Sequence, residues 1–238
     1  MGARAVARNA RRPRGVNTAV QTAAQVAQSG GQATAIQLAV ILAIASLAPA
    51  IVLTCTCFAR FAIVFSFLRN GLATQAAPPS QVLVGLALFM TLFVMAPVIA
   101  QVNDKAVQPY LAGDIGEKQA FEAAAPPVRR FLLERTRAAD LRLFYEVSSA
   151  PRPANADDVP MRIAIPAFVV SELRTAFEIG LVLLLPFLVI DLITATVLTS
   201  LGMIMLPPVI VSLPIKLLVF VAVDGWHLVV ESLLRGVM

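Results

Sequence analysis

Four long apolar runs constrain this chain more than any other feature of its sequence. They cover residues 36–68, 82–100, 179–201 and 209–230. Each approaches or exceeds the roughly 20 apolar residues that a helix needs to cross the hydrocarbon core of a bilayer. Because 58% of the residues are hydrophobic and only 14% are charged, the chain cannot cover a soluble globule with a polar surface. We therefore predict an all-α, membrane-associated protein and exclude a soluble enzyme.

The links between these runs predict two helical hairpins with proline-broken helices. A turn-like link at 69–81 joins the first two runs, and a tight link at 202–208 joins the last two. Between the hairpins lies a polar insertion with balanced charge, which we expect to be helical. The expected divisions are a disordered tail at 1–35, the first hairpin at 36–100, the polar region at 101–165 and the second hairpin at 166–238.

Two short helices are expected in the polar region. Asp114 and Glu117 have the spacing of a capping box that opens the first helix, and the double proline at 126–127 would end it. The second helix would start at that double proline and carry Phe131 and Phe144 on one side.

The tail at 1–35 contains arginines but no acidic residue. It has no aromatic side chain on which nucleic-acid bases could stack, so we expect a disordered basic arm, free or resting on anionic lipid, and no nucleic-acid partner. It also lacks the apolar core of a secretory signal peptide.

The sequence favours neither a metal site nor catalysis. Cys55 and Cys57 are two residues apart, and the single histidine, His227, lies far from them. We interpret both cysteines as small apolar packing residues. No nucleophile, base and orienting residue occur in a recognisable pattern, so we expect no enzymatic activity and no cofactor.

Prolines and charged residues interrupt the apolar runs. In lipid, a freed backbone carbonyl or a lone charge costs several kcal/mol, so these helices are expected to pack against protein. Asp191 and Lys216 lie within their runs, and Glu172 precedes the third run. We favour buried ion pairs that fix the assembly geometry, with a proton or ion relay as the alternative.

Several motifs follow one another in a specific order along residues 46–230. They include Phe67-Leu68-Arg69-Asn70-Gly71-Leu72, Thr136-Arg137-Ala138-Ala139-Asp140-Leu141, Ser171-Glu172-Leu173-Arg174-Thr175-Ala176-Phe177, Gly202-Met203-Ile204-Met205-Leu206-Pro207-Pro208 and Leu213-Pro214-Ile215-Lys216-Leu217. In this order they resemble the FliP family of type III secretion export-gate subunits.

The resemblance implies a pore-forming subunit of the flagellar export gate in the bacterial inner membrane, which passes unfolded flagellar proteins. It also implies a homopentamer that associates with FliQ and FliR homologues and other export-apparatus membrane proteins, with the polar region on the periplasmic side. An injectisome export-gate subunit is the first alternative. A small proton-coupled transporter with Asp191, Lys216 and Asp224 as its relay is the second, although the two hairpins do not resemble each other as transporter repeats would.

The resemblance also assigns roles to particular residues. Met203, Ile204 and Met205 would close the pore, where the family commonly has three methionines, and a simple hydrophobic turn is the alternative. Because isoleucine is stiffer than methionine, the central residue would make this seal less pliable.

Aromatic residues and charges at family positions are assigned to packing and assembly. Phe131 and Phe144 would hold subunits together, with packing inside one subunit as the alternative. Glu172 and Lys216 are expected to form a buried ion pair within or between subunits. Asp191 with Arg137 is the next pair to consider.

Overall fold

The computed structural model describes residues 46, 49–74, 78–151, 153 and 155–237. Among these residues the regular secondary structure is helical and contains no strand, as the composition predicts. Residues from Ala50 onward form one compact unit, which is described below. The predicted tail lies outside the described residues.

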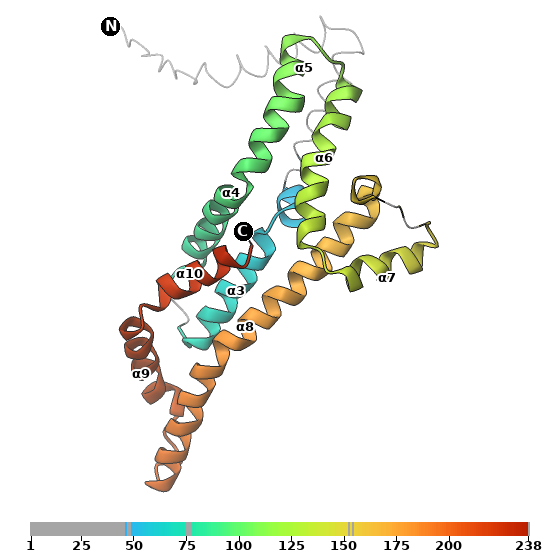
Figure 1. Cartoon of the computed structure of the whole chain (residues 1–238). Helices are drawn as coiled ribbons and strands as arrows, with labels where there is room; N and C mark the ends of the chain where they lie inside the picture. Colours follow the sequence, from blue (N-terminus) through green and yellow to red (C-terminus); the bar gives the residue numbers. More distant parts are fainter. Residues whose placement is uncertain (1–45, 47–48, 75–77, 152, 154, 238) are drawn as a thin grey trace, which may run out of the picture. The chain divides into compact units, whose positions relative to one another are not determined.

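The helices of this unit follow one another with short connections (Figure 1). They are α3 (Phe58–Gly71), α4 (Ser80–Val102), η1 (Asn103–Val107), α5 (Gln108–Ala112), α6 (Glu117–Arg135), α7 (Ala138–Ser148), η2 (Ala156–Asp158), α8 (Met161–Ser200), α9 (Pro208–Ala222) and α10 (Gly225–Arg235). A further helix, Pro49–Cys55, precedes α3.

Among the described residues, two helices are long and apolar enough to cross a membrane. One is α8, and the other is the continuous stretch Ser80–Ala112, in which α4 passes through the π-helical η1 into α5. With 40 residues α8 is ~60 Å long, about twice the thickness of the hydrocarbon core. Two bent helix pairs, Pro49–Cys55 with α3 and α9 with α10, raise the number of candidate spans to four if each pair counts as one span.

The sharp bends in these pairs do not lie at the prolines. The prolines of α4, α8 and α9 lie inside continuous helices, whereas the chain bends by 81° before α3 and by 63° before α10. At the first bend, the Thr56 hydroxyl accepts a hydrogen bond from the Phe58 amide at 3.2 Å and donates one to the Val52 carbonyl. At the second, Asp224 adopts a left-handed backbone with φ 52°. Local polar and backbone features therefore end these helices.

The main core lies along α3, which packs against both α4 and α8. Phe61, Val64, Phe65 and Leu68 recur at intervals of three and four residues and are fully buried. Their spacing places them on one helix face, so the apolar periodicity of this segment directly produces the core.

Two glycines allow α3 and α8 to approach closely. A Cβ atom on Gly180 of α8 would lie 2.5 Å from the Phe67 ring of α3, and a Cβ atom on Gly71 of α3 would lie 2.6 Å from the Phe187 ring of α8. Because Phe67 faces Gly180 and Gly71 faces Phe187, the two helices run in the same direction. We call this contact, from Arg60 and Glu172 to Gly71 and Phe187, the α3–α8 seam.

The polar region differs from its predicted helices. The Gly116 amide donates to the Gln119 side-chain oxygen at 3.1 Å, so the cap of α6 lies at these residues and the prediction of an Asp114–Glu117 capping box was wrong. The prediction that the double proline at 126–127 ends a helix was also wrong, because α6 continues to Arg135.

Tertiary packing explains why α6 persists through the two prolines. Proline in a helix interior removes one hydrogen bond and collides with an earlier carbonyl. Here Pro127, Phe131 and Leu132 are buried, and α6 packs against both α4 and α8. The burial of this face offsets the local cost. Because α6 ends at Arg135 and α7 begins at Ala138, Phe131 lies on α6 and Phe144 on α7, not on one helix.

Candidate functional site

The turn between α8 and α9 is an exposed apolar tip. Gly202, with φ 77°, ends α8 in a Schellman motif, in which the Met203 amide donates to the Leu198 carbonyl at 2.9 Å. Pro208 then occupies the first turn of α9, where a missing amide hydrogen is tolerated. This local chemistry makes the reversal tight.

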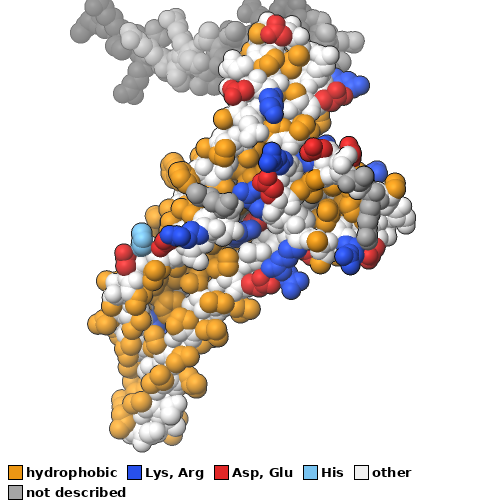
Figure 2. Space-filling view, viewed as in Figure 1, with side chains coloured by type: hydrophobic (Ala, Val, Ile, Leu, Met, Phe, Trp, Pro, Cys, Tyr) orange, Lys and Arg blue, Asp and Glu red, His pale blue; other side chains and the backbone are white. Residues whose placement is uncertain are grey.

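The predicted gate residues lie at this tip. Met203, Ile204 and Met205 are 45%, 81% and 97% exposed in the isolated chain. Large apolar side chains at the adjoining ends of α8 and α9 are exposed as well. Figure 2 shows these hydrophobic atoms over the two helices. The tip therefore exposes its apolar side chains to its surroundings.

A charged cluster lies farther along the same pair of helices. The Lys216 ammonium of α9 donates to an Asp191 carboxylate oxygen of α8 at 2.6 Å and to the Gly71 carbonyl at 3.0 Å. The Ser212 hydroxyl donates to the other Asp191 oxygen at 2.6 Å. The Lys216 side chain is 3% exposed, whereas that of Asp191 is 34% exposed. These contacts join α3, α8 and α9 in a region that is otherwise apolar.

A second buried ion pair lies at the opposite end of the α3–α8 seam. The Arg60 guanidinium makes two hydrogen bonds to the Glu172 carboxylate, one of them at 2.8 Å from Nε. Its remaining terminal nitrogen donates to the Gly236 carbonyl at 2.9 Å. Both side chains are buried, so the pair and this carbonyl satisfy one another away from water.

Within one chain, the sequence-based pairing of these charges was wrong. Glu172 pairs with Arg60 instead of Lys216, and Lys216 pairs with Asp191. Arg137 pairs with Glu178 at 2.5 Å instead of with Asp191. This pairing also raises the pKa of Arg137, mainly through its hydrogen bonds to Glu178.

Comparison with known proteins identifies the family. The FliP family matches residues 41–233, which is most of the chain. This chain belongs to the FliP family. The flagellar biosynthetic protein FliP of Bacillus subtilis strain 168 is 47% identical over 201 residues, covering 84% of this chain and 91% of the relative.

Two other relatives carry the same name. FliP of Pectobacterium carotovorum is 48% identical over 210 residues, covering 87% of this chain and 81% of the relative. FliP of Aquifex aeolicus is 42% identical over 209 residues, covering 87% of each chain. The family and these names support the flagellar interpretation of the sequence motifs.

The two aromatic residues assigned to subunit contact differ in exposure in this FliP-family chain. Phe131 is 3% exposed and packs against Phe168 with ring centroids 6.0 Å apart, while the Arg135 guanidinium lies over the Phe131 ring, 4.1 Å from its centroid. Phe144 is half-buried against the core. The burial of Phe131 favours packing inside one subunit, which was the alternative interpretation.

Sequence reasoning missed two groups that position the site. Arg60 interrupts the first apolar run. Because a lone charge in such a run is costly, the argument applied to Asp191 would also have predicted a buried partner for Arg60. Ser171 carried no such signal. Its hydroxyl accepts from the Arg137 amide at 3.0 Å and donates to Asp140 at 2.6 Å, and so ties the start of α7 to α8.

Among the described residues, no group of three or more His, Cys, Asp or Glu side chains could hold a metal ion. Cys55 and Cys57 are free thiols, half-buried and buried respectively. Both belong to or contact the hydrophobic core, which agrees with their interpretation as packing residues.

Proposed function

We propose that this chain is a pore-forming subunit of the flagellar type III export gate in the bacterial inner membrane, and that it passes unfolded flagellar proteins. We further propose that it assembles as a homopentamer with FliQ and FliR homologues and other export-apparatus membrane proteins. Membership of the FliP family supports the flagellar setting. The observation that carries the gate assignment is the exposed apolar tip formed by Met203, Ile204 and Met205.

A gate needs more than one copy of this chain. The two to four candidate spans among the described residues of one chain are too few to form a closed ring around a polypeptide-sized passage. Several copies placed around one axis would bring their tips together, and flexible thioether side chains would seal against one another at rest. The same side chains could rearrange around varied unfolded cargo, because methionine adapts its shape at low cost.

The packing of the tip fits this role. Its side chains contact little of their own chain, so a partner copy can cover them without any refolding of the core. Farther from the tip, Asp191 and Lys216 fasten α9 to α8 and α3. A channel that opens repeatedly needs a seal whose side chains can rearrange and, next to it, helices whose packing stays fixed.

The test is membrane leakage in cells that express the full chain with its export partners. Replacing Met203, Ile204 and Met205 together by alanine, or deleting them, should admit ions and small molecules because the seal is lost. A matched variant replaces Leu218, Val221 and Val223 by alanine; these side chains are also exposed but lie farther from the tip, so the membrane should stay tight. If both tip variants assemble and remain tight, the gate assignment is wrong.

The charged groups proposed for a transporter relay have other roles in this structure. Lys216 is bonded to Asp191 and Gly71, and Asp224 forms the left-handed residue between α9 and α10. These observations favour structural positions over the relay alternative. The names of the relatives likewise favour a flagellar gate over the injectisome alternative.

A further inference from the structure

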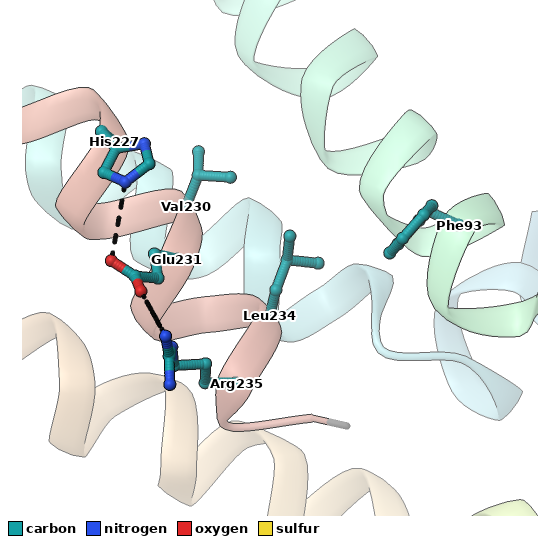
Figure 3. Close-up of a pocket in the computed structure, with 6 residues that line it drawn as sticks. All are labelled: Phe93, His227, Val230, Glu231, Leu234 and Arg235. Carbon is teal, nitrogen blue, oxygen red and sulfur yellow. Dashed lines mark hydrogen bonds and ion pairs between the residues drawn. The ribbon is translucent and has the colours of Figure 1, made fainter.

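A groove between α4 and α10 has an apolar floor and a charged rim (Figure 3). Phe93 of α4 faces Val230 and Leu234 of α10 across it, and His227, Glu231 and Arg235 line its edge. Its volume is about 680 Å³, within the roughly 300–1,000 Å³ of small-molecule sites. In this chain Phe93 is exposed at the groove wall.

The charged rim follows one face of α10. The Arg235 guanidinium donates to the Glu231 carboxylate at 2.9 Å, and the His227 ring lies 3.7 Å from the other carboxylate oxygen. Arg235 and His227 are exposed although α10 forms half of a bent apolar helix pair. An exposed guanidinium is costly in hydrocarbon, so this face favours a polar neighbour.

The end of α10 lies where the apolar helices meet the polar region. Immediately after Arg235, the Gly236 carbonyl accepts from Arg60, and the Val237 carbonyl accepts from Arg135 at the end of α6. Phe93 lies on α4 before that helix reaches the polar residues of η1. The Arg235 end of the groove therefore lies at this boundary, with the apolar wall beside it.

We propose that this groove binds one acyl chain of a zwitterionic phospholipid. The acyl chain would pack against Phe93, Val230 and Leu234. The phosphate would lie beside the positively charged Arg235, and the ammonium would lie beside the negatively charged Glu231. An exposed ion pair contributes little to stability, so Glu231 and Arg235 can give up their mutual contact for the phosphate and the ammonium at little cost.

The first experiment measures lipid retention by the purified full chain in detergent. Native mass spectrometry compares added phosphatidylethanolamine with phosphatidylglycerol that carries the same acyl chains. We expect phosphatidylethanolamine to be retained about fivefold more, a preference typical of one modest charge contact. Glu231→Gln should abolish this preference because it removes the partner of the ammonium. Equal retention by the unaltered chain, or an undiminished preference in Glu231→Gln, would overturn the proposal.

The second experiment blocks the groove. Val230→Trp should lower phospholipid retention about fivefold by filling the apolar floor, whereas Val221→Trp, at an exposed position on α9, should not. Equal retention by the two variants contradicts the proposal. A photo-reactive residue at position 230 in native membranes provides a readout that does not depend on tolerance of tryptophan. A phospholipid adduct supports the proposal, and an adduct with a second copy or another polypeptide assigns the groove to a protein partner and overturns it.

Discussion

The α3–α8 seam and the α8–α9 tip are both apolar in sequence, but the side chains of the seam are tightly packed and those of the tip are exposed. In the seam, aromatic rings fill spaces above Gly71 and Gly180, and every charge of the two ion pairs at its ends has a partner. At the tip, Met203, Ile204 and Met205 have little packing within their own chain. The contrast indicates that the seam carries stability, whereas the tip leaves its apolar side chains exposed.

The largest loss of stability is expected from breaking the Arg60–Glu172 pair. Arg60→Ala or Glu172→Ala leaves a buried, unpaired charge, which typically costs about 3–5 kcal/mol. The free energy of unfolding of the purified chain measures this cost. The double change Arg60→Leu with Glu172→Leu should cost less than either alanine variant, because no charge remains. Independent, additive losses would show that the two residues do not act as a pair.

The second charged cluster should respond asymmetrically to the loss of either partner. Asp191→Ala leaves the buried Lys216 ammonium with only the Gly71 carbonyl and should cost about 3 kcal/mol. Lys216→Met leaves a partly exposed carboxylate that still accepts from Ser212, and should cost about 1 kcal/mol or less. Thermal unfolding of both variants tests the order. A larger loss in Lys216→Met would mean that Asp191 is less solvated than its exposure indicates.

A steric change in the seam should have a smaller effect. Gly180→Ala forces a methyl group against the Phe67 ring and should cost about 1–3 kcal/mol, with part of the loss recovered by Phe67→Leu. Gly85→Ala is the matched control, because nothing lies within 4 Å of a Cβ atom there and alanine favours a helix. If the two glycine variants unfold alike, the close approach of α3 and α8 is not required.

The smallest effect on stability is expected at the tip. Ile204→Ser should change the free energy of unfolding by no more than about 0.5 kcal/mol, as is usual for exposed positions. The same variant should increase ion leakage in the assembled gate, whereas Ile204→Met should leave the membrane tight. A Ile204→Ser chain that unfolds much more readily would place this residue in a core and remove the contrast between seam and tip.

Local sequence signals predicted some of these features and failed at others. Gly202 and the double proline at 207–208 end and restart helices through their own backbone restrictions, so the tight turn followed directly from them. The double proline at 126–127 has the same local tendency, yet α6 continues because the face that carries Phe131 and Leu132 is buried. Local rules held where little tertiary packing opposed them.

Apolar run length and sparse charge by themselves determined that this chain is helical and suited to a membrane, since a bilayer demands long internally bonded segments. The charges within the runs also indicated that partners must exist, because a lone charge there is too costly. Which partners meet was decided by the tertiary structure alone. The parallel packing of α3 on α8 brings Arg60 to Glu172 across more than a hundred residues, and the return of α9 brings Lys216 to Asp191. Charge and spacing along a chain do not encode the register between distant helices, which depends on close contacts such as that between Phe67 and Gly180.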